Sequence, residues 1–312
     1  MSDARWGASG LLFLHVQTSL HAGSGTALGT IDLPVQRERH TEWPLVPGSS
    51  LKGILRDACR TDVARKVGGT RRDADADADL TVVFGPPTAE ADKHAGALSI
   101  TDARILAFPV RSLRGVFAWV TCPSILERLD RDLRVAGYDP LGEVPQPGRD
   151  RLACAADSPL LVDSKFAILE EFEFERAESP RFAPVAEWIA RHAIRDDDAA
   201  TRARLARQLV VLHDDDFTHF ARHATEVVAR IGLDYESKTV KNGALFYQEF
   251  VPPEALFYSI VLATGSQRRD RELAAPAVLS YVRERLPRVL QVGGDETTGK
   301  GLCVTRLDVR GA

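Results

Sequence analysis

The chain has 312 residues, of which 44% are hydrophobic and 27% are charged, and its formal net charge is −4. This composition is typical of a folded globular protein and excludes a disordered or fibrous chain. The acidic balance also excludes a protein that coats nucleic acid non-specifically, although it is compatible with a local basic groove. The length corresponds to about two average domains.

The four cysteines, at 59, 122, 154 and 303, contain no C-x-x-C pair. This spacing argues against a zinc ribbon, an iron–sulfur cluster and a disulfide framework, so we interpret them as small core residues in a reducing compartment. The apolar stretch near the N-terminus is short and contains His15, and no apolar run approaches the roughly 20 residues of a spanning helix. The sequence therefore predicts a cytoplasmic protein with no membrane contact.

The first half of the chain predicts strands around one clear helix. Residues 10–18 indicate a buried strand, and a glycine-rich loop follows over 21–29. A helix then begins between Pro47 and Ser50, with Leu51 and Leu55 on its apolar face. The aspartate-rich segment 68–80 lacks the glycine and the closing glutamate of an EF-hand, so we expect a solvated loop. Strands are expected over 97–107 and 112–121.

The second half adds helices and a hairpin. Ser124 and Glu127 indicate a capping box for a helix that stops at Gly137. A linker is expected over 138–149, strand-like sequence over 160–175, and helices over 184–194 and 199–213. Residues 225–235 and 244–251 predict a β-hairpin with Asn242-Gly243 as its turn. A strand (255–263), a helix (271–286) and a strand (301–309) end the chain.

These elements predict an α+β fold. A strand and a helix open the chain and a helix and a strand close it, which favours a ferredoxin-like or RNA-recognition-motif-like β-α-β-β-α-β palm. The intervening segments would be long insertions in that palm. The overlong hairpin would project from it.

The glycine-rich segment near the C-terminus matches a phosphate-binding P-loop from Gly294 to Lys300, but Gly301 replaces the required Ser or Thr. Too few residues follow Lys300 to build a nucleotide-binding domain. The glycines and Lys300 still allow backbone N–H groups to face an anion such as a phosphodiester. The alternative is a plain turn into the last strand.

Basic residues gather between positions 37 and 72, where nine Lys and Arg stand against four acids. Lys52 and Arg56, four residues apart, share one helix face near the positive end of the helix dipole. Either a solvated helix face or a polyanion site fits this pattern.

Asp32 is a single acid in an apolar, glycine-rich setting between His21 and His40. An aspartate is a weak base at neutral pH, so a catalytic Asp32 would more readily hold a divalent metal or orient a hydroxyl. The alternative is an aspartate that caps a turn.

Four blocks of the sequence carry a family resemblance. They are LHVQTSLHAGSGTALGTIDLPVQRERHTEWPLVPGSSLKGILR, GALSITDARILAFPVRSLRGVFAWVTCP, TEVVARIGLDYESKTVKNGALFYQEFVPPEALFYS and QVGGDETTGKGLC. They resemble, in the same order, the RAMP superfamily of CRISPR proteins, and specifically the repeated backbone subunit of the type III-B (Cmr) effector complex. The resemblance is weakest over 68–80 and 138–224.

The resemblance implies one RAMP-type fold over residues 1–312. Its palm would comprise about 8–66, 97–121 and 255–310, with an inserted region over about 122–224 and a β-hairpin "thumb" over about 225–251. It also implies a filament of copies of this chain that binds CRISPR guide RNA beside the other subunits of the complex. Such a subunit cleaves the paired single-stranded target RNA at regular intervals, through the RNA 2′-hydroxyl and with a divalent metal (Mg or Mn).

The resemblance also suggests roles for individual residues. Asp32 would be catalytic and would hold the metal, His21 would assist proton transfer, and Glu249 would assist in place of the consecutive acids common in the family. The RNA-binding residues would be Arg37, Arg39, Ser49, Ser50, Lys52, Arg56, Lys238, Lys241, Gly293, Gly294, Thr297, Thr298, Gly299 and Lys300. Two alternatives are a structural guide-RNA-binding subunit with little cleavage of its own and a stand-alone nuclease that processes guide precursors.

Overall fold

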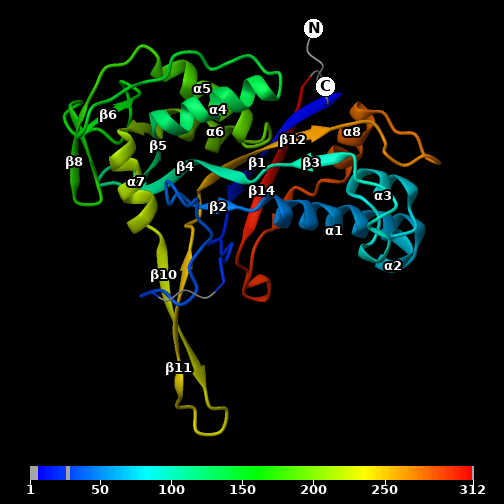
Figure 1. The fold of residues 1–312 in the computed structure, drawn as a ribbon. Helices are drawn as coiled ribbons and strands as arrows, with labels where there is room; N and C mark the ends of the chain where they lie inside the picture. Colours follow the sequence, from blue (N-terminus) through cyan, green and yellow to red (C-terminus); the bar gives the residue numbers. More distant parts are fainter. Residues whose placement is uncertain (1–5, 26–28, 311–312) are drawn as a thin grey trace.

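The computed structural model describes residues 6–25 and 29–310. Residues 26–28 of the expected glycine-rich loop lie outside the described residues. The chain forms a wide body built on one large sheet, and a single hairpin projects from it at the end opposite the two termini (Figure 1).

The centre of the sheet is the expected palm. Its strands lie in the order β14-β1-β12-β4, every neighbouring pair antiparallel. One helix, α1, lies between β1 and β4 in the chain and another, α8, between β12 and β14, which gives the β-α-β-β-α-β sequence with ferredoxin-like strand order 4-1-3-2. The predicted α+β class is confirmed. The elements are β1 (Ala8–Val16), α1 (Gly48–Val67), β4 (Ala103–Arg111), β12 (Leu256–Ala263), α8 (Ala275–Arg285) and β14 (Leu302–Val309).

The insertions extend this sheet. Beyond β4 the strand order continues β5-β9-β6-β8-β7, β13 pairs with β14 at the other edge, and β2 and β3 pair with β4 and β12. The inserted region therefore continues the sheet of the palm. These strands are β2 (Leu45–Val46), β3 (Leu98–Ile100), β5 (Phe117–Thr121), β6 (Arg151–Cys154), β7 (Phe166–Leu169), β8 (Phe172–Arg176), β9 (Leu209–Leu212) and β13 (Val289–Gln291).

The remaining helices lie in two groups (Figure 1). The first group, α4 (Pro123–Val135), α5 (Phe182–Ala193), α6 (Ala199–Gln208) and α7 (Asp214–His223), lies over the inserted half of the sheet. The second, α2 (Arg71–Ala74) and α3 (Ala78–Phe84), lies beside α1 and is followed by the 3₁₀ turn Thr88–Glu90. All four cysteines are buried, as expected. Among the described residues, no helix is long and apolar enough to span a bilayer.

The aspartate-rich segment is helical, so the expectation of a solvated loop is wrong. Thr70 and Asp73 form a capping box that starts α2, and Asp77 accepts from the backbone N–H of Leu80 to cap α3. Aspartate satisfies the free N–H groups of a first helical turn. The alternating aspartates therefore mark two helix starts.

Two other local predictions are also wrong. The expected helix 199–213 ends at Gln208, and the next four residues form β9, which pairs in parallel with β5 before α7 begins. The expected capping box at Ser124 does not form, because the N-cap position is Cys122, which makes no side-chain capping bond, and the Ser124 hydroxyl donates to Asp214 (2.5 Å). In both places a contact distant in the sequence determines the local structure.

The thumb hairpin comprises β10 (Glu226–Leu233), a turn over 234–239, and β11 (Val240–Phe250). The Asn242-Gly243 turn prediction is wrong, because these residues lie within β11. There the register shifts, since Ile231 pairs with Leu245 whereas Leu233 pairs with Val240. Gly243 has a φ of +73°, which suits glycine, and it allows this bulge.

Candidate functional site

Three segments from distant parts of the chain meet where the thumb hairpin joins the body. The loop between β1 and β2 contacts β11 through a bridge from Leu33 to Gln248, and the residue after β11 through a bridge from Leu20 to Val251. The glycine-rich loop between β13 and β14 contacts the same place, through a hydrogen bond from the Gly294 N–H to the His21 carbonyl (2.9 Å). The structure thus places Asp32, His21, Glu249 and the glycine-rich loop around one strand end.

Asp32 is exposed and held by the hairpin. Its Oδ2 accepts from the backbone N–H of Tyr247 (2.7 Å). The next residue, Leu33, is fixed on both sides, because its N–H donates to Tyr247 O (3.0 Å) and its carbonyl accepts from Glu249 N–H (2.9 Å). The second oxygen, Oδ1, has no hydrogen-bond partner among the residues described. Asp32 therefore caps a β11 N–H and keeps one oxygen for a ligand.

His21 is buried, with 8% of its surface exposed. Its Nδ1 donates to the Glu249 carbonyl (2.7 Å), and its ring lies against Phe250 at 5.6 Å between centroids. Because a carbonyl only accepts, the proton sits on Nδ1, and Nε2 is the nitrogen left for proton exchange. A Cβ at Gly23 would lie 2.7 Å from Nε2, so this nitrogen faces the backbone of the loop. In this conformation His21 connects the loop to β11.

Glu249 is buried and fully paired. Its Oε1 accepts from Arg37 Nη2 (2.6 Å) and from the Thr225 hydroxyl (2.8 Å), and its Oε2 accepts from Val35 N–H (2.9 Å). Arg37 also donates to the carbonyls of residues 42 and 221 (2.6 and 2.9 Å). All three hydrogen bonds to this buried carboxylate come from the chain itself, so its lone pairs are used within the fold. We name Val35, Arg37, Thr225 and Glu249 the Glu249 cluster. It fixes the Asp32 segment against the hairpin.

The glycine-rich loop packs closely against His21. A Cβ at Gly293 would lie 2.2 Å from the His21 carbonyl, so only glycine fits there. The Lys300 ammonium donates to the Ser19 hydroxyl (3.2 Å) and lies 5.0 Å from the centre of the Phe250 ring. Three predicted RNA-binding residues on the outer part of the loop are exposed: Thr297, Thr298 and Gly299.

Lys52 and Arg56, the predicted basic face of α1, are half-buried and contact another part of the chain. Lys52 Nζ donates to Leu98 O (2.8 Å) and Arg56 Nη1 to Pro86 O (3.3 Å), and two other Arg56 nitrogens are buried without a hydrogen-bond partner. Burial lowers the pKa of Lys52, as does the neighbouring Arg56. Burial also lowers the pKa of Arg56, with a further contribution from Arg60. Both cations thus contact segment 86–98 in the free chain.

Other predicted RNA-binding residues are accessible. Ser49 and Ser50 are exposed in the first turn of α1, whose Gly48 N–H donates to Asp102 (2.7 Å). Arg39 is exposed and has no ion-pair partner in the described part of the chain. Two lysines of the thumb hairpin, Lys238 and Lys241, are exposed as well. These exposed cations and hydroxyls are accessible to a polyanion, and Lys238 Nζ also lies 4.2 Å from the centre of the Tyr235 ring.

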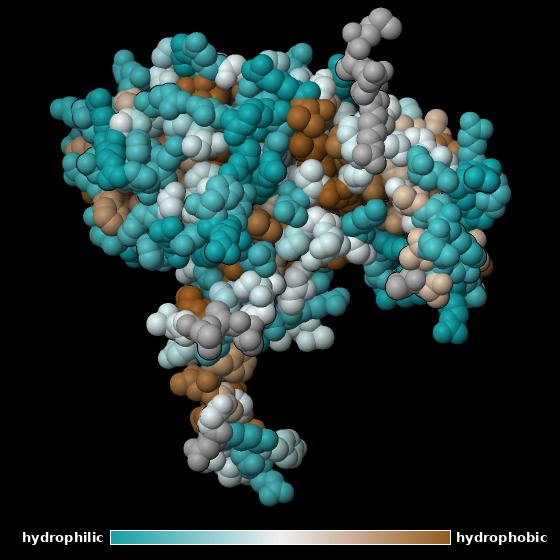
Figure 2. Space-filling model, in the orientation of Figure 1, coloured by the Kyte–Doolittle hydropathy of each residue, from teal (hydrophilic) through white to brown (hydrophobic). Residues whose placement is uncertain are grey.

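The thumb hairpin has an apolar surface, visible as a brown band along it in Figure 2. A two-stranded hairpin is marginally stable alone, and exposed apolar surface of this extent marks an interaction site. The exposed apolar side chains are Val227, Val228, Ile231, Leu233, Tyr235, Val240, Leu245 and Tyr247.

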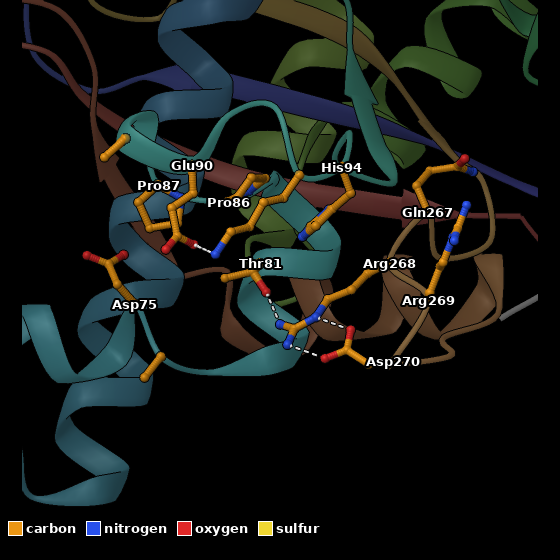
Figure 3. Close-up of a pocket in the computed structure, with 13 residues that line it drawn as sticks. Asp75, Thr81, Pro86, Pro87, Glu90, His94, Gln267, Arg268, Arg269 and Asp270 are labelled. Atoms are coloured by element: carbon orange, nitrogen blue, oxygen red, sulfur yellow. Dashed lines mark hydrogen bonds and ion pairs between the residues drawn. The ribbon is translucent and has the colours of Figure 1, made fainter.

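A separate pocket of about 930 Å³ lies between α3 and the loop after β12 (Figure 3). Most of its charged groups form ion pairs with one another, namely Arg268 with Asp270 and Lys93 with Glu90. Arg268 also donates to the Thr81 hydroxyl. None of the predicted site residues lines it. Within the described ranges no group of three or more His, Cys, Asp or Glu side chains is placed to hold a metal.

The sequence model of the RAMP superfamily matches residues 13–304. The chain belongs to the RAMP superfamily. It is 36% identical over 302 residues to the CRISPR system Cmr endoribonuclease Cmr4 of Pyrococcus furiosus, covering 95% of each chain. It is 26% identical over 313 residues to the CRISPR system CMR subunit Cmr4 of Saccharolobus solfataricus, covering 94% of each.

Solved structures of RAMP proteins share this fold. The crystal structure of oligomeric Cmr4 from Pyrococcus furiosus has a TM-score of 0.71 at 29% identity, covering 98% of this chain and 99% of that one. A chain of the type III-B Cmr-beta complex bound to cognate target RNA also has a TM-score of 0.71, at 23% identity, covering 97% and 98%. The resemblance to the type III-B backbone subunit is confirmed.

Proposed function

We propose that this RAMP protein is the filament subunit of a type III-B CRISPR complex that binds guide RNA and cleaves the paired target RNA. One observation carries the proposal: an exposed carboxylate, Asp32, is fixed at the base of an exposed apolar hairpin by the Tyr247 N–H. The similarity to a protein named Cmr endoribonuclease, over 95% of both chains, supports the activity. The similarity to an oligomeric Cmr4 supports assembly with copies of itself.

The thumb hairpin would separate bases of the guide–target duplex. Its apolar side chains are suited to stacking against bases, and an unstacked nucleotide leaves the adjacent phosphodiester free to rotate. The target 2′-hydroxyl then gives up its proton to water as its oxygen attacks phosphorus, the bond to the 5′-oxygen breaks, and that oxygen takes up a proton from water. The products are a 2′,3′-cyclic phosphate and a 5′-hydroxyl. Asp32 orients the reacting groups from the base of the hairpin.

Asp32 fits a divalent cation held jointly with RNA. Magnesium is commonly bound by one or two carboxylates together with substrate phosphates and water, and Asp32 Oδ1 is available for that role. A cation there would stabilise the charge that develops on the phosphate. Arg39, Lys238 and Lys241 and the glycine-rich loop would contact the backbone of guide and target, while base pairing reads the sequence. We infer that this takes place in the cytoplasm.

The test uses the assembled complex and a matched, labelled target RNA. Asp32→Asn is expected to abolish cleavage while guide and target binding change less than about twofold, because one solvated charge is removed. Asp139→Asn, an exposed acid outside the site, is the control and should cleave normally. EDTA should stop cleavage by the wild type.

Two results would change the assignment. Cleavage at the wild-type rate by Asp32→Asn would move the active site elsewhere. A wild-type complex that binds target RNA without cutting it would favour the structural backbone subunit instead.

A further inference from the structure

The direction of the thumb hairpin is set where it joins the body. Its two strands form a sheet separate from the main one, and the bridge of β11 to the body, Leu33 with Gln248, lies near its base. Side chains along most of its length are exposed. The orientation of the hairpin relative to the palm is therefore set by contacts at its base.

Asp295 makes two of those contacts from the glycine-rich loop. Its Oδ2 accepts from Gln248 Nε2 in β11 (2.6 Å) and pairs with Arg230 Nη2 in β10 (3.2 Å). One carboxylate oxygen thus contacts both strands of the hairpin. The Asp295 and Arg230 side chains are 21% and 27% exposed, so water screens this ion pair less than a surface pair.

The backbone at Asp295 is held in an unusual conformation. Its φ is +62°, in the left-handed region that few residues other than glycine adopt. The conformation is held because the Asp295 carbonyl accepts from the Thr298 hydroxyl (2.9 Å) and from Lys300 N–H (3.2 Å). Held outliers of this kind are concentrated where a structure needs a group in one place. Asp295 thus links the exposed outer residues of the loop to both strands of the hairpin.

A second interaction reinforces the connection. The Arg230 guanidinium lies 5.6 Å from the centre of the buried Phe250 ring, and the Lys300 ammonium lies 5.0 Å from the same ring. Arg230 is therefore placed by Phe250 and by Asp295 together. A displacement of the loop would move both cations around the ring where β11 enters the body.

We propose that Asp295 is a positioning residue that couples the glycine-rich loop to the direction of the thumb hairpin. This proposal rests on the proposed function, in which the direction of the hairpin determines where the target RNA is distorted and cut. Asp295 touches neither Asp32 nor, in this proposal, RNA. It acts through Gln248 and Arg230.

The first measurement needs no RNA. Spin labels at Glu236→Cys on the hairpin and Arg191→Cys on α5 report the distance between thumb and body, since both sites are exposed and the four native cysteines are buried. Asp295→Gly removes both contacts and suits the left-handed backbone, and Arg230→Gln removes the ion pair from the hairpin side. Both variants should broaden the distance distribution. The control Glu296→Asn, a neighbouring exposed residue without a hairpin contact, should leave it unchanged.

The second measurement uses assembled complexes with a labelled target. Asp295→Gly should lose the uniform spacing of cleavage products while guide affinity changes less than about twofold. A purely structural defect would lower the yield of complex and leave the cut positions in place. Asp295→Asn, which keeps the acceptor for Gln248, should restore much of the spacing.

An unchanged distance distribution in both Asp295→Gly and Arg230→Gln would overturn the proposal. So would equal broadening by Glu296→Asn. A wild-type complex that does not cleave would refute the proposed function alone, because the distance measurement is independent of cleavage.

Discussion

Replacing Glu249 by glutamine separates a structural from a catalytic role for this residue. The substitution removes the charge that pairs with Arg37 and leaves one acceptor oxygen for three donors. Breaking a buried ion pair from one side costs about 3–5 kcal/mol. Arg37 retains two carbonyl acceptors, so we expect the lower end, about 3 kcal/mol. With an unfolding entropy of about 2.1 cal/mol/K per residue over 312 residues, this lowers Tm by about 5 °C.

Thermal unfolding by circular dichroism measures the shift, and target cleavage is measured on the same preparations well below Tm. Because the Glu249 cluster holds Asp32 in place, cleavage should fall partly. Glu236→Gln, an exposed glutamate at the turn of the same hairpin, should change neither quantity. A Glu249→Gln protein with wild-type Tm and no cleavage would contradict this reasoning and make Glu249 a catalytic residue.

Two further predictions concern charge. Arg39→Ala should reduce the slope of log affinity for guide RNA against log salt concentration by about 0.7. Lys52→Ala should leave this slope unchanged, because Lys52 already donates to Leu98. Titrations at several salt concentrations measure both slopes, and equal changes would contradict the prediction. Burial alone would raise the pKa of Glu38, but hydrogen bonds from Arg128 and Thr41 together outweigh burial and bring this pKa below its ordinary 4.5. Its ionised form therefore stabilises the fold above that pH, and the stabilisation is lost as pH falls through the lowered pKa. Urea unfolding should show Glu38→Gln less stable at pH 7, with the difference shrinking in acid; a constant difference would contradict the assignment.

The palm was predictable from the sequence because its signals are local. The apolar run of β1, the start of α1 and the alternating strands of the hairpin each fix a structure within a few residues. The strand β9 was missed because Leu209–Leu212 continues an apolar pattern that also fits a helix. Its pairing with β5 depends on residues far away in the chain. The aspartates of 68–80 were misinterpreted because caps and solvated loops have the same composition.

The sequence predicts which residues form the candidate site, but it does not predict their hydrogen-bond partners or their burial. Asp32, His21, Glu249 and the glycine-rich loop do meet, yet no spacing shows that Glu249 is saturated by three donors or that His21 is buried. Nothing in the sequence around Asp295 indicates its contacts with Gln248 and Arg230, because both partners lie in the distant hairpin. Covering of Lys52 and Arg56 by segment 86–98 likewise depends on tertiary packing.

The bulge in β11 affects how the free subunit behaves. A hairpin with two open edges and an apolar surface is a template for pairing with other chains, and such edges lead to aggregation. The register shift between Ile231 and Leu233 interrupts the regular spacing of edge N–H and C=O groups that an incoming strand would need. We therefore expect the irregularity to disfavour pairing of the exposed strands with another chain, at a position where Gly243 makes the distortion sterically possible.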